Sequence, residues 1–199
     1  VILIGKDTRI SSDMLESALM AGICSVGGDV KPVGTIPTPA VAYLARQEGA
    51  DAGIVLSASH NPYEHNGIKV FSGQGYKLSD AVEARIEEKI LSPEPMKLRT
   101  RGEIGRRYHG MRQLKRDYID FVASTVESDL SGLRILVDCA NGAASATAPE
   151  LFGRFRAHTD FLHRDPDGVN INHRCGSTHL EDLAQQVLRG GYDVGVAFD

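Results

Sequence analysis

The stretch AGIVLSASHNPYEHNGIK, residues 52–69, holds the strongest clue to how this chain folds. Its first five residues are apolar and predict a buried strand. The thirteen residues that follow include serines, histidines, asparagines and a lysine, which is more polar chemistry than a turn alone requires. Reactive groups in open α/β sheets gather where strands end. Ser59 is therefore either an ordinary loop residue or a nucleophile.

A serine hydroxyl is a weak nucleophile that needs a neighbouring base or cation. His60 and Lys69 are the nearest candidates for that role. Glycines close by would let backbone N–H groups approach an anion, and they are Gly67, Gly73 and Gly75. Short motifs often match by chance, so this one alone favours a hydrogen-bonded surface loop.

Apolar runs alternate along the chain with segments of helical periodicity, a pattern typical of α/β proteins with a largely parallel sheet. Strands are predicted at residues 1–5, 29–36, 51–56, 67–71, 134–138, 156–163 and 193–198. Helices are predicted at residues 13–26, 38–48, 80–91, 112–128, 141–152 and 178–188. Side-chain caps are expected from Thr38, Asp80 and Thr178 at the starts of three of these helices.

Residues 92–110 separate two such sets, since they combine two prolines, three glycines and many cations. We therefore predict two consecutive three-layer α/β/α domains, residues 1–107 and 108–199, each with a mixed, largely parallel sheet. The chain opens on VILIG and stops at DVGVAFD, both strand-like. We expect a piece of a longer protein, with the second domain truncated at its C-terminal end.

Composition limits the classes of partner. The net charge of −4 and the pI of about 6.0 give no reason to expect nucleic acid, and no apolar run is long enough for a membrane helix. The basic run 97–116 is interpreted as a solvated face. Three scattered cysteines favour reduced thiols and a cytoplasmic location over a disulfide framework.

Two further polar features stand at strand ends. In GKDTRIS, residues 5–11, Asp7 and Ser11 are candidate helix caps, and Arg9 has the fork of donors that suits a phosphate. Asp199 follows the last strand, and carboxylates in such places hold Mg²⁺, a cation that prefers oxygen. A single aspartate does not make a metal site by itself.

Two other patterns are weaker. Cysteine and histidine residues near the C-terminal end suggest zinc, but their spacing fits no paired scheme; they are His163, His173, Cys175 and His179. DCANGAAS, residues 138–145, hints at a dinucleotide loop, yet it lacks the G-x-G-x-x-G pattern, so helix packing is the better explanation for its small residues.

Together, five ordered motifs resemble the α-D-phosphohexomutase superfamily, most closely its glucosamine branch. They are GKDTRISS (5–12), SASHNPYEHNGIKVF (57–71), GYKLSD (75–80), VDCANGAAS (137–145) and VNINHRCGSTHLEDL (169–183). The resemblance implies a phosphosugar mutase that interconverts glucosamine 6-phosphate and glucosamine 1-phosphate. It implies a phosphoserine enzyme, a glucosamine 1,6-bisphosphate intermediate, a homodimer, and a role in supplying UDP-N-acetylglucosamine for cell-wall synthesis.

The resemblance also implies roles for individual residues. Ser59 would be the serine that carries the phosphoryl group, with His60 and Lys69 beside it and Lys69 a candidate general acid/base. Arg9 would contact the phosphoryl group. Ser59 and Asp199 would bind one Mg²⁺, since Asp199 matches the first aspartate of the family's D-G-D-G-D-R loop.

The match is incomplete. The other two metal carboxylates, domains III and IV, and an opening F-G-T-D-G-x-R-G segment have no counterpart in these residues. We therefore expect residues 1–199 alone to be inactive. Phosphoglucomutase or phosphomannomutase activity stays open, because the sugar-selecting loop is among the missing parts. A non-catalytic nucleotide-binding α/β module also stays open, and it would carry no covalent phosphate.

Overall fold

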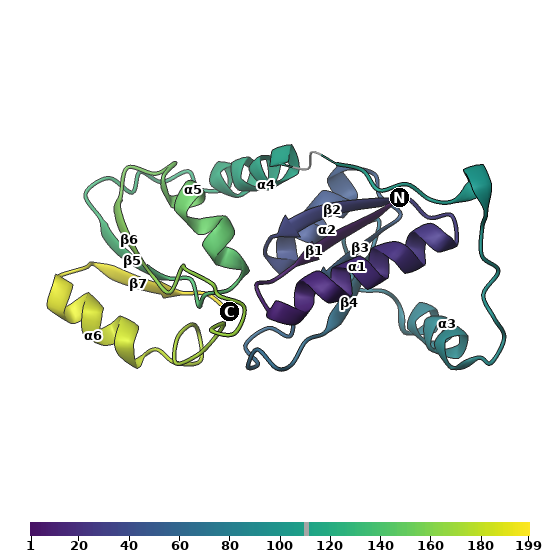
Figure 1. Cartoon of the computed structure of the whole chain (residues 1–199). Coiled ribbons are helices and arrows are strands. Elements are labelled where there is room, and N and C mark those ends of the chain that lie inside the picture. The colour runs from purple at the N-terminus through teal and green to yellow at the C-terminus, as the bar shows by residue number, and fades with distance from the viewer. Residues whose placement is uncertain (110–111) are drawn as a thin grey trace.

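A computed structural model describes residues 1–109 and 112–199, which form two α/β lobes side by side (Figure 1). The first lobe contains β1 (Ile2–Lys6), α1 (Ile10–Ser25), β2 (Val30–Thr35), α2 (Thr38–Gln47), β3 (Ala52–Leu56), β4 (Ile68–Ser72), α3 (Asp80–Leu91) and the 3₁₀ turn η1 (Arg101–Glu103). Next come α4 (Arg112–Ser124), β5 (Arg134–Asp138), the 3₁₀ turn η2 (Ala143–Ala146), α5 (Ala148–Phe152), β6 (His158–Leu162), α6 (Glu181–Gly190) and β7 (Val194–Ala197).

Each lobe is built on one sheet. The first sheet has the strand order β2-β1-β3-β4, in which β4 alone runs antiparallel to its neighbour. The second has the order β6-β5-β7 and is parallel throughout the described residues. Helices lie on both faces of each sheet (Figure 1). The predicted pair of α/β/α domains with largely parallel sheets is therefore confirmed.

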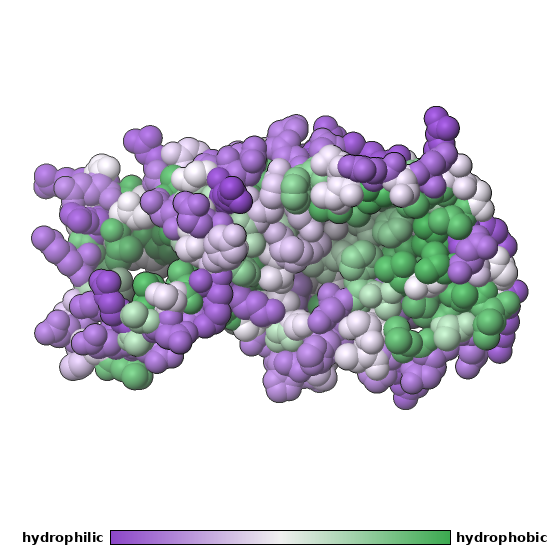
Figure 2. All heavy atoms as spheres, turned by 180° about the vertical axis from the view of Figure 1, so that it is seen from behind, coloured by the Kyte–Doolittle hydropathy of each residue, from purple (hydrophilic) through white to green (hydrophobic). Residues whose placement is uncertain are grey.

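Two separate cores hold the lobes. In the first, apolar side chains of β1, β3 and α2 pack together, and the buried set includes Leu3, Val33, Ile36, Ala40, Val41, Leu44 and Val55. In the second, β5 packs on η2 and α5, with Ile135, Val137, Cys139, Ala144 and Ala148 buried. Viewed from behind, apolar side chains also gather at the surface of the second lobe (Figure 2). In the described residues no helix has both the length and the apolarity to cross a membrane.

Helix α4 packs on both lobes. Its Leu114 is buried in the first core, and the Phe121 ring stacks on Tyr43 of α2 with 4.1 Å between ring centroids. Asp120 forms an ion pair with Arg154, which follows α5 in the second lobe. The helix therefore belongs equally to both halves, and the boundary between residues 107 and 108 stays a prediction.

The segment before α4 lies along the edge of the first sheet. Arg107 forms a parallel bridge with Val30 of β2, flanked by hydrogen bonds between Val30 N and Arg106 O (2.8 Å) and between Tyr108 N and Val30 O (2.9 Å). The prediction of a linker or exposed edge for residues 92–110 covers this strand-like piece, while Gly110 falls outside the described residues.

The helix starts differ from the predicted caps. Helix α1 begins three residues earlier than predicted, at Ile10, and none of the helices α1, α2, α3 and α6 has a side-chain cap at its start. Thr38 and Asp80 are first helical residues rather than caps, and α6 begins at Glu181, beyond Thr178. A cap requires extended backbone at the residue concerned, and residue type alone does not fix that conformation.

Two predicted helices are also shorter than expected. Helix α4 ends at Ser124 rather than Ser128, and its most buried residues are Leu114 and Ile119. The helix predicted over residues 141–152 is divided into η2 and α5, because the backbone of Thr147 (φ −128°) interrupts it.

Candidate active site

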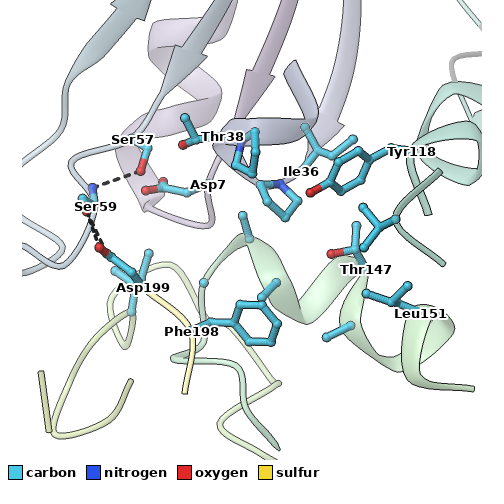
Figure 3. Close-up of a pocket in the computed structure, with 18 of the residues that line it drawn as sticks. Asp7, Ile36, Thr38, Ser57, Ser59, Tyr118, Thr147, Leu151, Phe198 and Asp199 are labelled. Atoms are coloured by element: carbon cyan, nitrogen blue, oxygen red, sulfur yellow. Dashed lines mark hydrogen bonds between the residues drawn. The ribbon is translucent and has the colours of Figure 1, made fainter. Parts of the chain in front are cut away.

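The predicted nucleophile Ser59 and the carboxylate of Asp199 are in contact between the two lobes. Ser59 follows the end of β3, and Asp199 follows the end of β7 (Figure 3). The Ser59 hydroxyl Oγ lies 2.7 Å from Oδ1 and 2.9 Å from Oδ2 of Asp199, so it donates a hydrogen bond to that carboxylate. The contact joins residues 140 positions apart in the sequence. The ends of β3 and β7 thus place Ser59 and Asp199 in one site between the lobes.

His60 and Lys69 lie around this pair. His60 Nδ1 is 3.5 Å from Ser59 Oγ and 3.8 Å from Asp199 Oδ2, so the imidazole faces both groups. Lys69 lies on β4 opposite Val55 of β3, and it lines the same cavity as Ser59 and Asp199. The four residues therefore share one site that draws on both lobes.

The cavity at this site has a volume of ≈ 470 Å³ and two unlike ends (Figure 3). Near Ser59 it is polar, with Asp7, Ser57, Lys69 and Asp199 in its wall. Farther along the lobe boundary it becomes mostly apolar, lined by residues of α4, of α5 and of the segments that precede α2 and α5: Ile36, Pro37, Tyr118, Ile119, Thr147 and Leu151. A cleft with convergent polar groups at one end suits a small molecule held near Ser59.

The Ser59 loop has an unusual backbone. Ser59 adopts φ 56°, in the left-handed region where side chains other than glycine, asparagine and aspartate are uncommon. Its N–H donates to Ser57 Oγ at 3.1 Å. At the other end of the loop, a Cβ on Gly67 would lie 2.9 Å from the Ser57 carbonyl oxygen, so only glycine allows the two ends to close.

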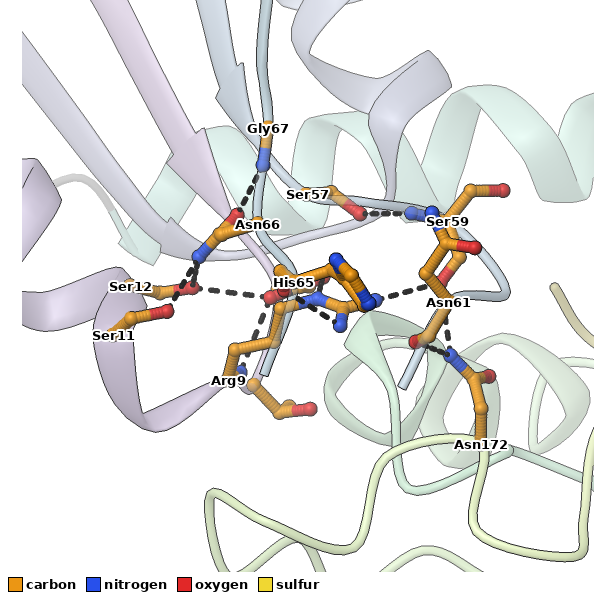
Figure 4. Close-up of polar contacts among 12 residues, drawn as sticks. Arg9, Ser11, Ser12, Ser57, Ser59, Asn61, His65, Asn66, Gly67 and Asn172 are labelled. Atoms are coloured by element: carbon orange, nitrogen blue, oxygen red, sulfur yellow. Dashed lines mark hydrogen bonds and ion pairs between the residues drawn. The ribbon is translucent and has the colours of Figure 1, made fainter. Parts of the chain in front are cut away.

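Arg9 supports this loop from beneath (Figure 4). Its side chain is fully buried, and Nε donates to Asp7 Oδ2 at 2.8 Å. Its other donors reach carbonyl oxygens of the loop: Pro62, His65 (2.9 Å) and Ser59 (2.8 Å). The expected contact with a phosphoryl group does not match this arrangement, because the side chain is fully buried and four of its five N–H donors bind within the protein.

Asn66, missed in the sequence, anchors the far side of the loop. Its side-chain nitrogen donates to Ser11 Oγ (2.9 Å) and Ser12 Oγ (3.2 Å) in the first turn of α1, and its oxygen accepts from Gly67 N (2.8 Å). Ser12 in turn donates to Asp7 Oδ1 at 3.1 Å. Ser11 and Asp7 thus position the loop rather than cap a helix, which corrects the expectation for both.

Two residues of the candidate zinc pattern belong to a hydrogen-bonded cluster. Of the cysteine and histidine residues considered, His163 and Cys175 come together, and Asp138 completes the group. The buried Asp138 carboxylate accepts from Ala140 N (2.8 Å) and Gly176 N (2.9 Å), and Oδ1 also lies 3.0 Å from His163 Nδ1. Both carboxylate oxygens are satisfied without an ion, so the cluster reads as structural.

Burial makes two of the three thiols unreactive. It raises the pKa of Cys139 to about 12 and that of Cys175 to about 11, and the nearby Asp138 carboxylate adds to both shifts. Because the reactive species is the thiolate, both remain protonated thiols at pH 8. We expect iodoacetamide to label Cys24, which is half-buried on α1, at least ~10-fold faster than either.

Peptide mass spectrometry after brief labelling of the native protein would measure the three rates. Labelling in guanidinium serves as the control, since unfolding exposes every thiol. Modification of Cys139 or Cys175 at the rate of Cys24 would show that their burial is wrong.

The donors at the lobe boundary fit a hard divalent cation. Ser59 Oγ and the Asp199 carboxylate are oxygen donors in mutual contact, and Asp199 is half-exposed. Mg²⁺ commonly takes one or two carboxylates together with phosphate oxygens and waters. These two residues therefore suit Mg²⁺ when a phosphate is attached to Ser59.

The chain is similar to known proteins over all of its length. It is 54% identical to the phosphoglucosamine mutases of Acetivibrio thermocellus and Moorella thermoacetica over essentially all of its own length. The chain spans 44–45% of the length of these relatives. It also superposes on a phosphoglucomutase/phosphomannomutase family protein from Burkholderia thailandensis with a TM-score of 0.80 and 26% identity, over 100% of this chain and 44% of that one.

Two family models divide the sequence as the lobes do. The model of phosphoglucomutase/phosphomannomutase α/β/α domain I matches residues 1–96, and the model of α/β/α domain II matches residues 116–199. Both lobes, in the expected order, are thus accounted for by one family. The chain belongs to the phosphoglucomutase/phosphomannomutase family.

Proposed function

We propose that this chain forms the serine-bearing part of a mutase that interconverts glucosamine 6-phosphate and glucosamine 1-phosphate. The observation that carries the proposal is the contact between the Ser59 hydroxyl and the Asp199 carboxylate across the two lobes. The curated relatives named phosphoglucosamine mutase support the choice of sugar. The product would supply UDP-N-acetylglucosamine for cell-wall synthesis, in the cytoplasm, where the three free cysteines stay reduced.

The reaction begins with a phosphoryl group on Ser59. The free hydroxyl of the bound sugar phosphate attacks that phosphorus, the bond from phosphorus to Ser59 Oγ breaks, and the sugar becomes a 1,6-bisphosphate. The attacking hydroxyl loses its proton, and Ser59 Oγ gains one as it leaves. After the intermediate turns over, its other phosphoryl group returns to Ser59, so the net change moves phosphate between O6 and O1.

The residues around Ser59 supply what this transfer needs. Lys69, in the cavity wall, is our candidate for moving the proton, and His60 lies beside Ser59 and Asp199. Ser59 and Asp199 would hold Mg²⁺, which when bound offsets negative charge on the transferred group. Positioning and charge neutralisation make up most of the catalysis in phosphoryl transfer.

Arg9 has a supporting role in this proposal. Its donors face loop carbonyls and its charge pairs with Asp7, so it fixes the Ser59 backbone instead of touching the phosphoryl group.

Phosphoglucomutase or phosphomannomutase activity is the second candidate, and the family models that match both lobes favour it. The two alternatives share Ser59 chemistry and differ only in the sugar. A non-catalytic nucleotide-binding module is separate from both, because it carries no phosphate on Ser59.

The test is a substrate comparison with the intact protein that contains this chain. We expect kcat/KM for glucosamine 6-phosphate to exceed that for glucose and mannose 6-phosphates by at least ~10-fold, because hydrogen bonds to an amino group discriminate strongly. A higher value for glucose or mannose phosphate would assign the second candidate. Absence of turnover on all three, together with an unphosphorylated Ser59, would favour the binding module.

A further inference from the structure

The Ser59 carbonyl oxygen receives one hydrogen bond from each lobe (Figure 4). Arg9 Nη2 donates from the first lobe at 2.8 Å, and Asn172 Nδ2 donates from the second at 2.9 Å. The same Asn172 nitrogen donates to the Asn61 carbonyl oxygen at 3.1 Å. Asn172 therefore holds two backbone positions of the nucleophile loop from the opposite lobe.

Asn172 is itself held firmly. It is 9% exposed, and its backbone N donates to the Ala140 carbonyl oxygen at 2.9 Å. Its φ of 58° lies in the left-handed region, which asparagine tolerates better than most residues. Because Asn172 is held in place, it can fix the positions of the Ser59 and Asn61 carbonyl groups. A flexible surface side chain would instead move together with the loop.

The loop that carries Asn172 also fixes the approach to Asp199. Ser177 N donates to the Phe198 carbonyl oxygen at 2.9 Å. Gly176 adopts φ 79°, and a Cβ there would lie 2.7 Å from the Ala140 Cβ and 3.0 Å from the Phe198 oxygen, so the loop packs tightly against both. Residues 172–177 thus contact Ser59 at one end and the residue before Asp199 at the other.

We propose that Asn172 is a positioning residue that sets the Ser59 hydroxyl against the Asp199 carboxylate. The inference rests on the proposed function of Ser59 and names a residue that acts through it. Without the two Nδ2 donors, the left-handed Ser59 backbone loses its support from the second lobe. The loop then relaxes, and the hydroxyl moves out of line with the bound sugar.

The contribution of Asn172 is separable from general docking of the lobes. Thr8 Oγ1 donates to the Asn141 carbonyl oxygen at 2.6 Å, and Ile10 N donates to the Gly168 carbonyl oxygen at 2.8 Å. These contacts join the lobes without touching the Ser59 loop, so the lobes stay together when the Asn172 side chain is removed.

The test uses Asn172→Gly and Asn172→Asp in the intact protein. Glycine keeps the left-handed backbone and removes both donors. Aspartate keeps the size and shape but turns acceptor oxygens toward two carbonyls. We expect kcat to fall about 100-fold in the glycine variant, as for a misplacement of about 1 Å, with KM within about 3-fold. The aspartate variant should lose at least as much.

Arg174→Gly is the matched control, because Arg174 is exposed in the same loop and also has a positive φ of 54°. It adds the same glycine flexibility without removing a donor to Ser59. We expect it to keep full activity and the same melting temperature as Asn172→Gly. A second readout is the rate at which added glucosamine 1,6-bisphosphate phosphorylates Ser59, which should fall only in the Asn172 variants.

The outcomes distinguish failure of the positioning role of Asn172 from failure of the mutase proposal. If Asn172→Gly keeps kcat within about 3-fold of the wild type while Ser59→Ala is inactive, the positioning role is wrong and the mutase proposal stands. An equal loss in Arg174→Gly, or a loss explained by a lower melting temperature, would also overturn it. If Ser59→Ala stays active, both proposals fail together.

Discussion

Replacing Ser59 with alanine is expected to abolish both the covalent phosphate and the turnover of the intact protein. The side chain loses only its hydroxyl oxygen, so the loop built by Arg9 and Asn66 should persist. No group remains to receive or return a phosphoryl, and a nucleophile acting within a catalytic unit costs most of the rate enhancement when removed. We expect kcat to fall by at least about 10⁴-fold.

Two measurements check this result. Intact-mass spectrometry should find a phosphate adduct on the wild-type protein, assigned to the Ser59 peptide, and none on Ser59→Ala. Steady-state assays should give the rate loss, while thermal unfolding should show little change. Ser79→Ala is the matched control, since Ser79 is exposed at the start of α3 and its hydroxyl caps nothing. Activity of Ser59→Ala near that of Ser79→Ala would rule out a phosphoserine mechanism.

Replacing Arg9 with methionine should destabilise the protein more than any other single change discussed for this chain. The Arg9 side chain is fully buried, and its partner Asp7 is only 5% exposed, so the substitution strands a buried carboxylate. Breaking a buried ion pair in this way lowers the free energy of unfolding by about 3–5 kcal/mol. The His65 carbonyl oxygen loses its Arg9 donor and the Ser59 carbonyl oxygen loses one of its two donors, so the loop should loosen and activity should fall.

Urea denaturation of Arg9→Met, Arg9→Lys and the double variant Asp7→Asn/Arg9→Met separates charge from geometry. Lysine keeps the positive charge but lacks the planar set of guanidinium donors. Compared with Arg9→Met, Arg9→Lys should therefore recover some stability and little activity. The double variant removes the stranded carboxylate and should also recover stability without activity. Arg85→Met, at an exposed position of α3, should stay within about 0.5 kcal/mol of the wild type. Full activity in the double variant would contradict a positioning role for Arg9.

The alternation of strands and helices was predictable because it depends on local periodicity. AGIVL and RILVD have the apolar runs of buried strands, and both are strands in the structure. Helix ends were not predictable to the residue. Thr38 and Asp80 have the right chemistry for caps, but each lies one residue inside its helix, and neither helix has a side-chain cap.

The site was predictable where chemistry and strand ends coincide, as at Ser59 and Asp199. It was not predictable where a side chain acts through tertiary contacts. Arg9 has donors that suit a phosphate, but it donates them to the carbonyl oxygens of Ser59 and His65 in the loop that covers it. Asn66 and Asn172 each bind groups more than 50 positions away, and a lone asparagine in a loop gives no sequence signal of such partners.

The division of the reactive pair between two lobes has a consequence for biosynthesis. Ser59 leaves the ribosome 140 residues ahead of Asp199. At elongation rates of about 5–20 residues per second, the first lobe has roughly 7–28 s in which to fold before Asp199 is made. A nascent chain therefore contains Ser59 before the carboxylate that accepts its hydrogen bond, that of Asp199, has been synthesised.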